Sequence, residues 1–277
     1  MAFITMNLMS QSLMRTVPVN VVLPVDKIAF PGMKKRPEAP FKTLYLLHGV
    51  FGSYIDWVNG TRVQRYADEN NLCVVMPSGD NASYIDRPAS GNNYGEFVGR
   101  ELVELTRKIF PLSHRREDTF IGGLSMGGYG AIRNGLKYHE TFGAIAALSS
   151  ALNMEDFKNL TNESPMMIFR RDFVEAVFGD LDEALESDKN PRYLVKQLLK
   201  KKAEFPAIYL ACGEEDSLLH YNQDFAAFLE ENGVKATFEV GPGNHEWDFW
   251  DRYIKKAIDW LPLERAGQGI NSGNVGI

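Results

Sequence analysis

Residues Gly123-Leu124-Ser125-Met126-Gly127 directly follow the strand-like run Thr119-Phe120-Ile121. A G-x-S-x-G pattern after a strand is typical of a sharp strand-to-helix turn that presents its serine at the tip. The backbone of such a turn is strained, and glycine on both sides of the serine avoids clashes with neighbouring segments. The motif also fits a serine in an ordinary glycine-rich turn. The rest of the chain therefore has to decide between the two interpretations.

Most of the chain alternates between continuous apolar runs and helix-like stretches. The apolar runs cover 43–47, 72–76, 119–124, 143–148, 207–212 and 236–240, and the helix-like stretches cover about 61–70, 95–110, 127–138, 218–232 and 247–260. Unbroken apolar strands indicate burial on both faces of a sheet. Strand–helix alternation predicts an α/β fold with a mostly parallel, twisted sheet and helices on both faces.

Two parts of the chain depart from this alternation. Residues 2–10 and 15–23 have no helix between them and predict an antiparallel pair at one edge of the sheet, with Pro18 favouring an edge position. Residues 151–204 contain short amphipathic pieces and no strand-like run, which predicts a helical, cap-like insertion over one end of the sheet. We expect one domain over residues 1–262 and a flexible C-terminal tail over 263–277.

Composition narrows the functional classes. The chain has 277 residues, 44% hydrophobic and 24% charged, and its net charge of −6 argues against a nucleic-acid-binding protein. The N-terminus lacks a basic segment followed by an apolar core, and no run is long enough to cross a membrane. Cys73 and Cys212 lie in predicted buried strands and indicate reduced thiols in a cytoplasmic protein. The composition is compatible with either a monomer or a homo-oligomer.

A serine hydroxyl needs a base within hydrogen-bond reach and an acid that orients the base. His245 follows the last predicted strand on the turn that begins at Gly241, so we expect it at the same end of the sheet as Ser125. The other histidines have less suitable positions: in a helix, at a helix end, on a polar connection, or at a strand end that precedes Ser125. They are His220, His139, His114 and His48, respectively.

The predicted acid is Asp216, with Glu215 as the alternative. Both follow the run 207–212 in a turn that begins at Gly213. A surface acidic turn or a helix N-cap would also explain them. Ser125, Asp216 and His245 nevertheless occur in the chain order and at the strand ends that a serine–acid–histidine hydrolase layout requires.

An oxyanion hole requires two backbone N–H groups that face the developing negative charge. One should come from Met126, which follows the serine. The other should come from the loop Gly49–Gly52, with Val50 as the first candidate and Phe51 as the next.

Several aromatic residues near predicted strand ends are candidates for substrate binding, although each could serve packing alone. The predicted substrate-binding residues are Phe51, Trp57, Tyr94 and Trp247, and Tyr84 and Trp250 are also near strand ends. A zinc motif H-E-x-x-H is incomplete at His245 because position 249 is phenylalanine. The glycines of 122–128 do not fit a dinucleotide-binding motif, so we expect neither metal nor cofactor.

Four sequence blocks resemble the esterase D family. They are Leu46-Leu47-His48-Gly49 with Trp57, Val75-Met76-Pro77, the block Phe120–Ala131 around Ser125, and Gly243-Asn244-His245-Glu246-Trp247 with Trp250. The family includes tributyrin esterases, S-formylglutathione hydrolases, some feruloyl esterases and mycolyltransferase antigens. The resemblance covers roughly residues 5–262 and is nearest to the bacterial tributyrin esterases. It implies an α/β-hydrolase with a Ser-Asp-His triad and carboxylesterase activity.

The resemblance also sets the alternatives. It implies a serine carboxylesterase that hydrolyses short-chain acyl or small aryl esters, such as acetyl or feruloyl esters, through an acyl-enzyme intermediate. An S-formylglutathione hydrolase-like thioesterase or an acyltransferase is the first alternative, and a non-catalytic binding protein on the same fold is the second. S-formylglutathione hydrolases usually carry histidine where this chain has Tyr129. The predicted partner is a small-molecule ester.

Overall fold

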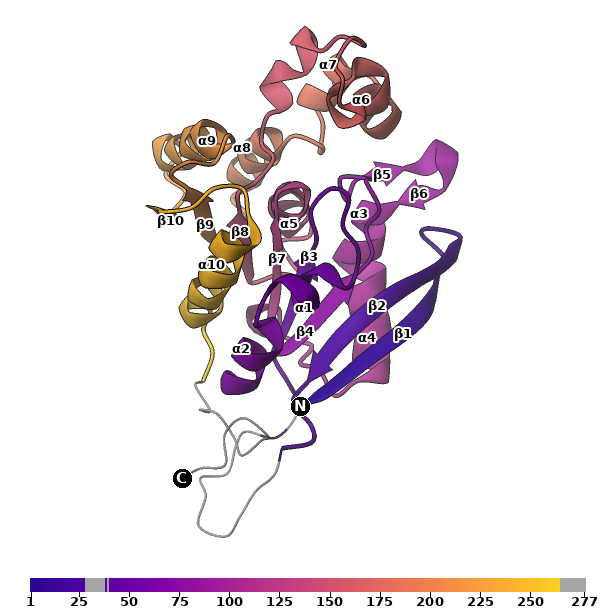
Figure 1. The fold of residues 1–277 in the computed structure, drawn as a ribbon, viewed down its shortest axis with the longest axis vertical. Coiled ribbons are helices and arrows are strands. Elements are labelled where there is room, and N and C mark those ends of the chain that lie inside the picture. Colours follow the sequence, from indigo (N-terminus) through magenta and orange to yellow (C-terminus); the bar gives the residue numbers. More distant parts are fainter. Residues whose placement is uncertain (28–37, 39, 265–277) are drawn as a thin grey trace.

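The computed structural model describes residues 1–27, 38 and 40–264, so the predicted tail lies outside the described residues from position 265 onward. The main sheet contains β1 (Ala2–Ser10), β2 (Arg15–Leu23), β3 (Thr43–Leu47), β4 (Cys73–Pro77), β7 (Thr119–Leu124), β8 (Ala144–Leu148), β9 (Ala207–Gly213) and β10 (Ala236–Gly241). Its strand order is β1-β2-β4-β3-β7-β8-β9-β10 (Figure 1). All six predicted apolar runs and both N-terminal runs therefore form strands of this sheet.

The sheet is parallel except at its N-terminal edge. β2 is antiparallel to both β1 and β4, whereas β3, β4 and β7 to β10 are parallel to one another. The prediction that Pro18 favours an edge strand is wrong for β2, which lies between β1 and β4. Proline is tolerated there because the β2–β4 register begins at Val19. The Pro18 carbonyl oxygen still accepts a hydrogen bond from Ser78 N–H.

Burial follows position in the sheet. Every residue of β3, β4, β7 and β8 is buried, as continuous apolar strands predict. The same expectation was wrong for β10, which is mostly exposed or half-buried because it pairs only with β9 at the sheet edge. Cys73 and Cys212 are buried, unpaired thiols inside β4 and β9.

Helices cover both faces of the sheet. One face packs against α4 (Leu102–Ile109), α5 (Met126–Lys137), α8 (Pro191–Lys201) and α9 (Leu219–Glu231). The other face packs against α1 (Asp56–Gly60), α2 (Val63–Glu69) and α10 (Trp247–Trp260). The predicted helix over 95–110 consists of α3 (Tyr94–Glu96), a π-helical turn η2 (Phe97–Glu101) and α4. No helix among the described residues is both long and apolar enough to span a bilayer.

Short elements went unpredicted because two or three residues carry no detectable period. They are β5 (Asp86–Arg87) and β6 (Asn92–Asn93), which pair as a separate small sheet, and the 3-10 turns η1 (Pro88–Ser90) and η3 (Arg116–Asp118). The β5–β6 hairpin lies between β4 and α3 in the chain, beyond the carboxyl end of β4.

The segment between β8 and β9 is helical. It contains η4 (Met154–Asn159), η5 (Met167–Phe169), α6 (Arg171–Phe178), α7 (Leu181–Leu185) and then α8. Figure 1 shows α6 and α7 standing beyond the end of the sheet. Phe157, Val174 and Phe178 form a small core there with Tyr129 of α5. The insertion is therefore packed onto the helix that follows Ser125.

The six parallel strands end at a common edge. The loops after β3, β4, β7, β9 and β10 leave from this edge and carry His48, Gly79, Ser125, Asp216 and His245. Ligands of open α/β sheets bind at the carboxyl ends of the strands. The topology of the sheet alone therefore places the predicted site residues at one end of the molecule.

Candidate active site

Ser125 joins β7 to α5 in a strained conformation. Its φ is 55° and its ψ is −120°, which side-chain-bearing residues adopt rarely. A Cβ on Gly127 would lie 2.4 Å from the Leu47 carbonyl oxygen, and one on Gly123 would lie 2.3 Å from the Gly127 carbonyl oxygen. Glycine is therefore required on both sides of the serine, because the turn presses directly against the end of β3.

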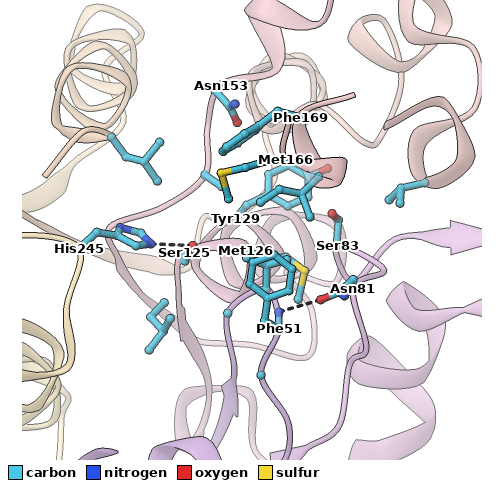
Figure 2. A pocket seen from close by; sticks show the side chains of 18 of the residues that line it. Phe51, Asn81, Ser83, Ser125, Met126, Tyr129, Asn153, Met166, Phe169 and His245 are labelled. Carbon is cyan, nitrogen blue, oxygen red and sulfur yellow. Dashed lines mark hydrogen bonds between the residues drawn. The ribbon is translucent and has the colours of Figure 1, made fainter. Parts of the chain in front are cut away.

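The three predicted catalytic side chains form one hydrogen-bonded chain. His245 Nε2 lies 3.0 Å from Ser125 Oγ, and His245 Nδ1 lies 2.9 Å from Asp216 Oδ2. Figure 2 shows the His245 ring pointing at Ser125 from the loop after β10. Asp216 is buried, whereas the His245 side chain is partly open to the cavity. This order places an oriented base against a serine hydroxyl.

Asp216 is held as a carboxylate. Burial alone would raise its pKa, but hydrogen bonds from His245 and from Leu218 N–H bring the pKa below its usual value. The Leu218 bond to Asp216 Oδ1 measures 2.8 Å. The alternative acid, Glu215, instead accepts Gly243 N–H at 2.8 Å and braces the loop that carries His245. The geometry therefore brings Asp216 and not Glu215 to the histidine.

The loop after β3 lies beside the serine. Gly49, Val50 and Phe51 border the same cavity as Ser125 and Met126. Phe51 N–H is already engaged, since it donates to Asn81 Oδ1 at 2.8 Å (Figure 2). No protein acceptor for Val50 N–H is found in the described part of the chain. Of the two predicted donors from this loop, Val50 is the one left available.

A large cavity opens above Ser125. Its volume is about 820 Å³, and it lies between the strand-end loops and the insertion. Figure 2 shows Met166 and Phe169 reaching into it from the insertion, opposite Met126 and Phe51. Apolar side chains dominate the lining, and Ser83, Asn81 and Asn153 add polar groups. Such a cavity suits a small organic ligand with few hydrogen-bonding groups.

The predicted substrate-binding aromatics divide into two pairs. Phe51 and Trp247 border the cavity, whereas Trp57 and Tyr94 do not. Trp57 is buried beneath Trp247, and its indole N–H donates to the Leu47 carbonyl oxygen at 3.0 Å. Tyr94 contacts Asp80 through its hydroxyl and borders a separate cavity of about 250 Å³. Nearness to a strand end does not decide which way a ring points. The sequence therefore did not distinguish the rings that border the cavity from those that do not.

The sequence predicts a cap-like insertion, but the side chains that the insertion contributes to the cavity wall were not predicted. The missed lining residues include Met166, Ile168, Phe169, Phe173 and Val177. Phe173 and Val177 lie four residues apart on α6, so both occupy one face of that helix. This spacing could have identified the two residues as lining residues. No sequence pattern could have identified Asn81 and Ser83, because they lie on a short loop without regular periodicity.

The remaining histidines do not border the cavity. His48 is buried, with both ring nitrogens hydrogen-bonded to backbone groups of Gly49 and Gly79. His114, His139 and His220 are absent from the lining. Among the described residues, His245 is therefore the histidine that can serve Ser125 as a base.

The fold and this site together define an α/β-hydrolase. The family model named Esterase, with the description "Putative esterase", matches residues 10–261. An acetyl esterase of Caldicellulosiruptor saccharolyticus is 42% identical over 261 residues, covering 94% of this chain and 98% of that protein.

Two solved structures from Staphylococcus aureus are also similar. The fluorophosphonate-binding serine hydrolase FphF is 32% identical, with a TM-score of 0.82. The S-formylglutathione hydrolase FrmB is 32% identical, with a TM-score of 0.80. Each comparison covers 94% of this chain and 98% of the other. The chain belongs to the Esterase family, and it is a carboxylic ester hydrolase.

Proposed function

We propose that the protein is a serine carboxylesterase that hydrolyses short-chain acyl or small aryl esters through an acyl-enzyme intermediate. The observation that carries the proposal is the continuous chain from Asp216 through His245 to Ser125, with contacts of 2.9 and 3.0 Å. A buried carboxylate, an oriented imidazole and a strained serine that borders the cavity are the parts that nucleophilic acyl transfer needs. The acetyl esterase relative supports a short acyl group.

In the first half-reaction, Ser125 Oγ bonds to the ester carbonyl carbon while its proton passes to His245 Nε2. The carbonyl oxygen becomes an oxyanion, which the N–H groups of Met126 and Val50 stabilise. The carbon–oxygen bond to the alcohol then breaks, and the alcohol leaves with the proton from His245. Water repeats the sequence on the acyl-enzyme, so the acid is released and the Ser125 hydroxyl is restored. Asp216 keeps the imidazole in the required tautomer throughout.

Residues 151–204 act as a cap on this site. Met166, Phe169 and Phe173 supply apolar walls opposite the catalytic loops. Burial of an acyl or aryl group against them is favourable at about 25 cal/mol per Å² of apolar surface removed from water. Exchange of the cap should therefore change acyl-chain preference. An unchanged acyl profile after exchange would contradict this role.

A thioesterase or acyltransferase is the second candidate, favoured by the similarity to the S-formylglutathione hydrolase of Staphylococcus aureus. The same acyl-enzyme would form from a thioester or pass its acyl group to an alcohol or thiol. Relative kcat/KM values for matched oxygen and thiol esters distinguish a thioesterase from a carboxylesterase. Product ratios in water with an added acceptor alcohol distinguish an acyltransferase from a hydrolase.

The test is hydrolysis of p-nitrophenyl esters from acetate to laurate by the wild type and by Ser125→Ala, with Ser90→Ala as a surface control. The proposal predicts activity that falls with chain length, disappears in Ser125→Ala and is unchanged in Ser90→Ala. Activity that survives in Ser125→Ala would identify another nucleophile. Absence of activity from every protein would favour a narrow substrate or a non-catalytic binding protein.

A further inference from the structure

His48 is a buried histidine with a defined tautomer. Gly79 N–H lies 2.8 Å from His48 Nε2 and can only donate, so Nε2 is the acceptor. The proton must therefore lie on Nδ1, which donates to the Gly49 carbonyl oxygen at 2.7 Å. Burial lowers the pKa of His48, against smaller opposing effects of the Gly49 bond and of Asp56 and Asp80. The neutral ring thus presents one fixed donor to the loop after β3.

The group that His48 holds belongs to the same peptide unit as Val50 N–H. A peptide bond is planar and trans, so the carbonyl of residue 49 and the N–H of residue 50 point in opposite directions. By fixing the Gly49 oxygen, His48 also fixes the direction of Val50 N–H. We propose that His48 is a positioning residue, which orients the Val50 N–H toward the oxyanion through the shared peptide plane. This inference rests on the proposed function, since it takes Val50 as an oxyanion donor.

Other contacts leave His48 as the principal restraint on this peptide. Gly52 N–H also reaches the Gly49 oxygen, but at a longer 3.3 Å. The loop after β4 supplies the remaining support: Tyr84 donates its hydroxyl to the His48 carbonyl oxygen at 3.0 Å, and Asn81 accepts Phe51 N–H. The loops after β3 and β4 are thus joined on both sides of Val50.

The Phe51 bond has a related consequence. Phe51 has a φ of 65°, so the chain turns sharply after Val50. Because Asn81 occupies Phe51 N–H, the neighbouring Val50 N–H is the group of this loop that remains for substrate. A donor oriented in advance stabilises charge that develops in the transition state more than it stabilises bound substrate. Loss of the orientation should therefore reduce kcat and leave KM nearly unchanged.

The decisive comparison is between His48→Asn and His48→Gln. The side-chain amide of asparagine can place an N–H near the position of Nδ1 and so retain the bond to the Gly49 oxygen. Glutamine instead reaches the position of Nε2 and can accept Gly79 N–H, but it loses the bond to Gly49. We expect His48→Gln to lower kcat by about tenfold or more with KM within about threefold. His48→Asn should retain most of the wild-type kcat.

A boronic acid inhibitor provides a second readout, because its tetrahedral adduct places an oxygen in the oxyanion hole. Its inhibition constant should rise in parallel with the loss of kcat. Tyr45→Phe is the matched control, since it removes a different buried hydrogen bond, to Thr106, from the strand β3 that leads to His48. That variant should lose stability without a change in kcat or in boronic acid affinity.

Wild-type kcat in His48→Gln, or equal losses in the two His48 variants, would overturn the inference. If neither variant folds, Tyr84→Phe must lower kcat at constant KM, and wild-type kcat there would overturn it instead. Ser125→Ala is measured in parallel. Activity that survives in Ser125→Ala contradicts the proposed function itself, whereas an inactive Ser125→Ala beside a fully active His48→Gln contradicts only the role of His48.

Discussion

Trp250 donates its indole N–H to Ser149 Oγ at 3.1 Å. The Ser149 hydroxyl is also hydrogen-bonded to Asp216, where it helps to lower the pKa of that carboxyl. The Trp250 ring stands edge-on to His245, with 4.9 Å between ring centroids. One side chain of α10 therefore supports both the proposed acid, Asp216, and the proposed base, His245, which explains why a buried tryptophan lies at this position.

The Ser149 contact predicts a measurable loss when it is removed. Ser149→Ala deletes a hydrogen bond to a charged group, which is worth about 1.5 kcal/mol or more, so kcat should fall by about tenfold. Ser150→Ala is the control, since no hydrogen-bond partner for the Ser150 hydroxyl is found among the described residues. Steady-state kinetics of both variants tests this, and equal activity of the two would contradict it.

The assignment of the acid predicts different effects at adjacent positions. Asp216→Asn retains the shape of the side chain but favours the wrong imidazole tautomer, so kcat should fall by about a thousandfold or more. Glu215→Gln still accepts Gly243 N–H through its amide oxygen and should retain most activity. Measurement of kcat/KM for both variants distinguishes Asp216 from Glu215 as the acid. Near-wild-type activity in Asp216→Asn would show that the acid is misassigned.

The buried His48 predicts a stability change with pH. Its pKa in the folded state lies below the unfolded value of about 6.5, because burial disfavours the charged ring. The unfolded chain therefore binds a proton first, and the folded state loses stability as pH falls below about 6.5, until the folded pKa is reached. Urea unfolding at about pH 7.5 and about pH 5 should show a smaller loss for His48→Asn than for the wild type. Equal losses would refute this prediction.

The position of Phe173 predicts a change in chain-length preference. Phe173 borders both the main cavity and the neighbouring cavity of about 250 Å³. Phe173→Ala should connect the two spaces and raise kcat/KM for longer acyl esters relative to acetate. Met167→Ala is the control, because Met167 is exposed and borders neither cavity. The ester series provides the measurement, and parallel profiles for both variants would exclude a role for Phe173.

The parts of the fold that depend on long regular patterns could be predicted from sequence. Continuous apolar runs located the buried strands, and strand–helix alternation gave the parallel sheet with its antiparallel N-terminal edge. Because parallel strands share one carboxyl edge, the positions of Ser125, Asp216 and His245 after three different strands were enough to predict their proximity. The four other histidines were disfavoured by their positions in the predicted elements or before Ser125 in the chain.

Features that depend on side-chain direction could not be predicted. Trp57 and Trp247 both lie near strand ends, yet Trp57 is buried beneath the other ring. The β5–β6 hairpin is too short for a period, and Pro18 gave a misleading signal because its effect depends on where the β2–β4 register begins. The role proposed for His48 could not be inferred from sequence, because it depends on the hydrogen bonds of the ring to the backbone of Gly49 and Gly79.

In the proposed reaction, Ser125 carries the acyl group during turnover. The most direct measurement is rapid quenching of the enzyme during turnover of p-nitrophenyl acetate, followed by intact-protein and peptide mass spectrometry. We predict a mass increase of one acetyl group on the peptide that contains Ser125, and its absence in Ser125→Ala. Acetylation of another residue, or hydrolysis at wild-type rate by Ser125→Ala, would contradict it.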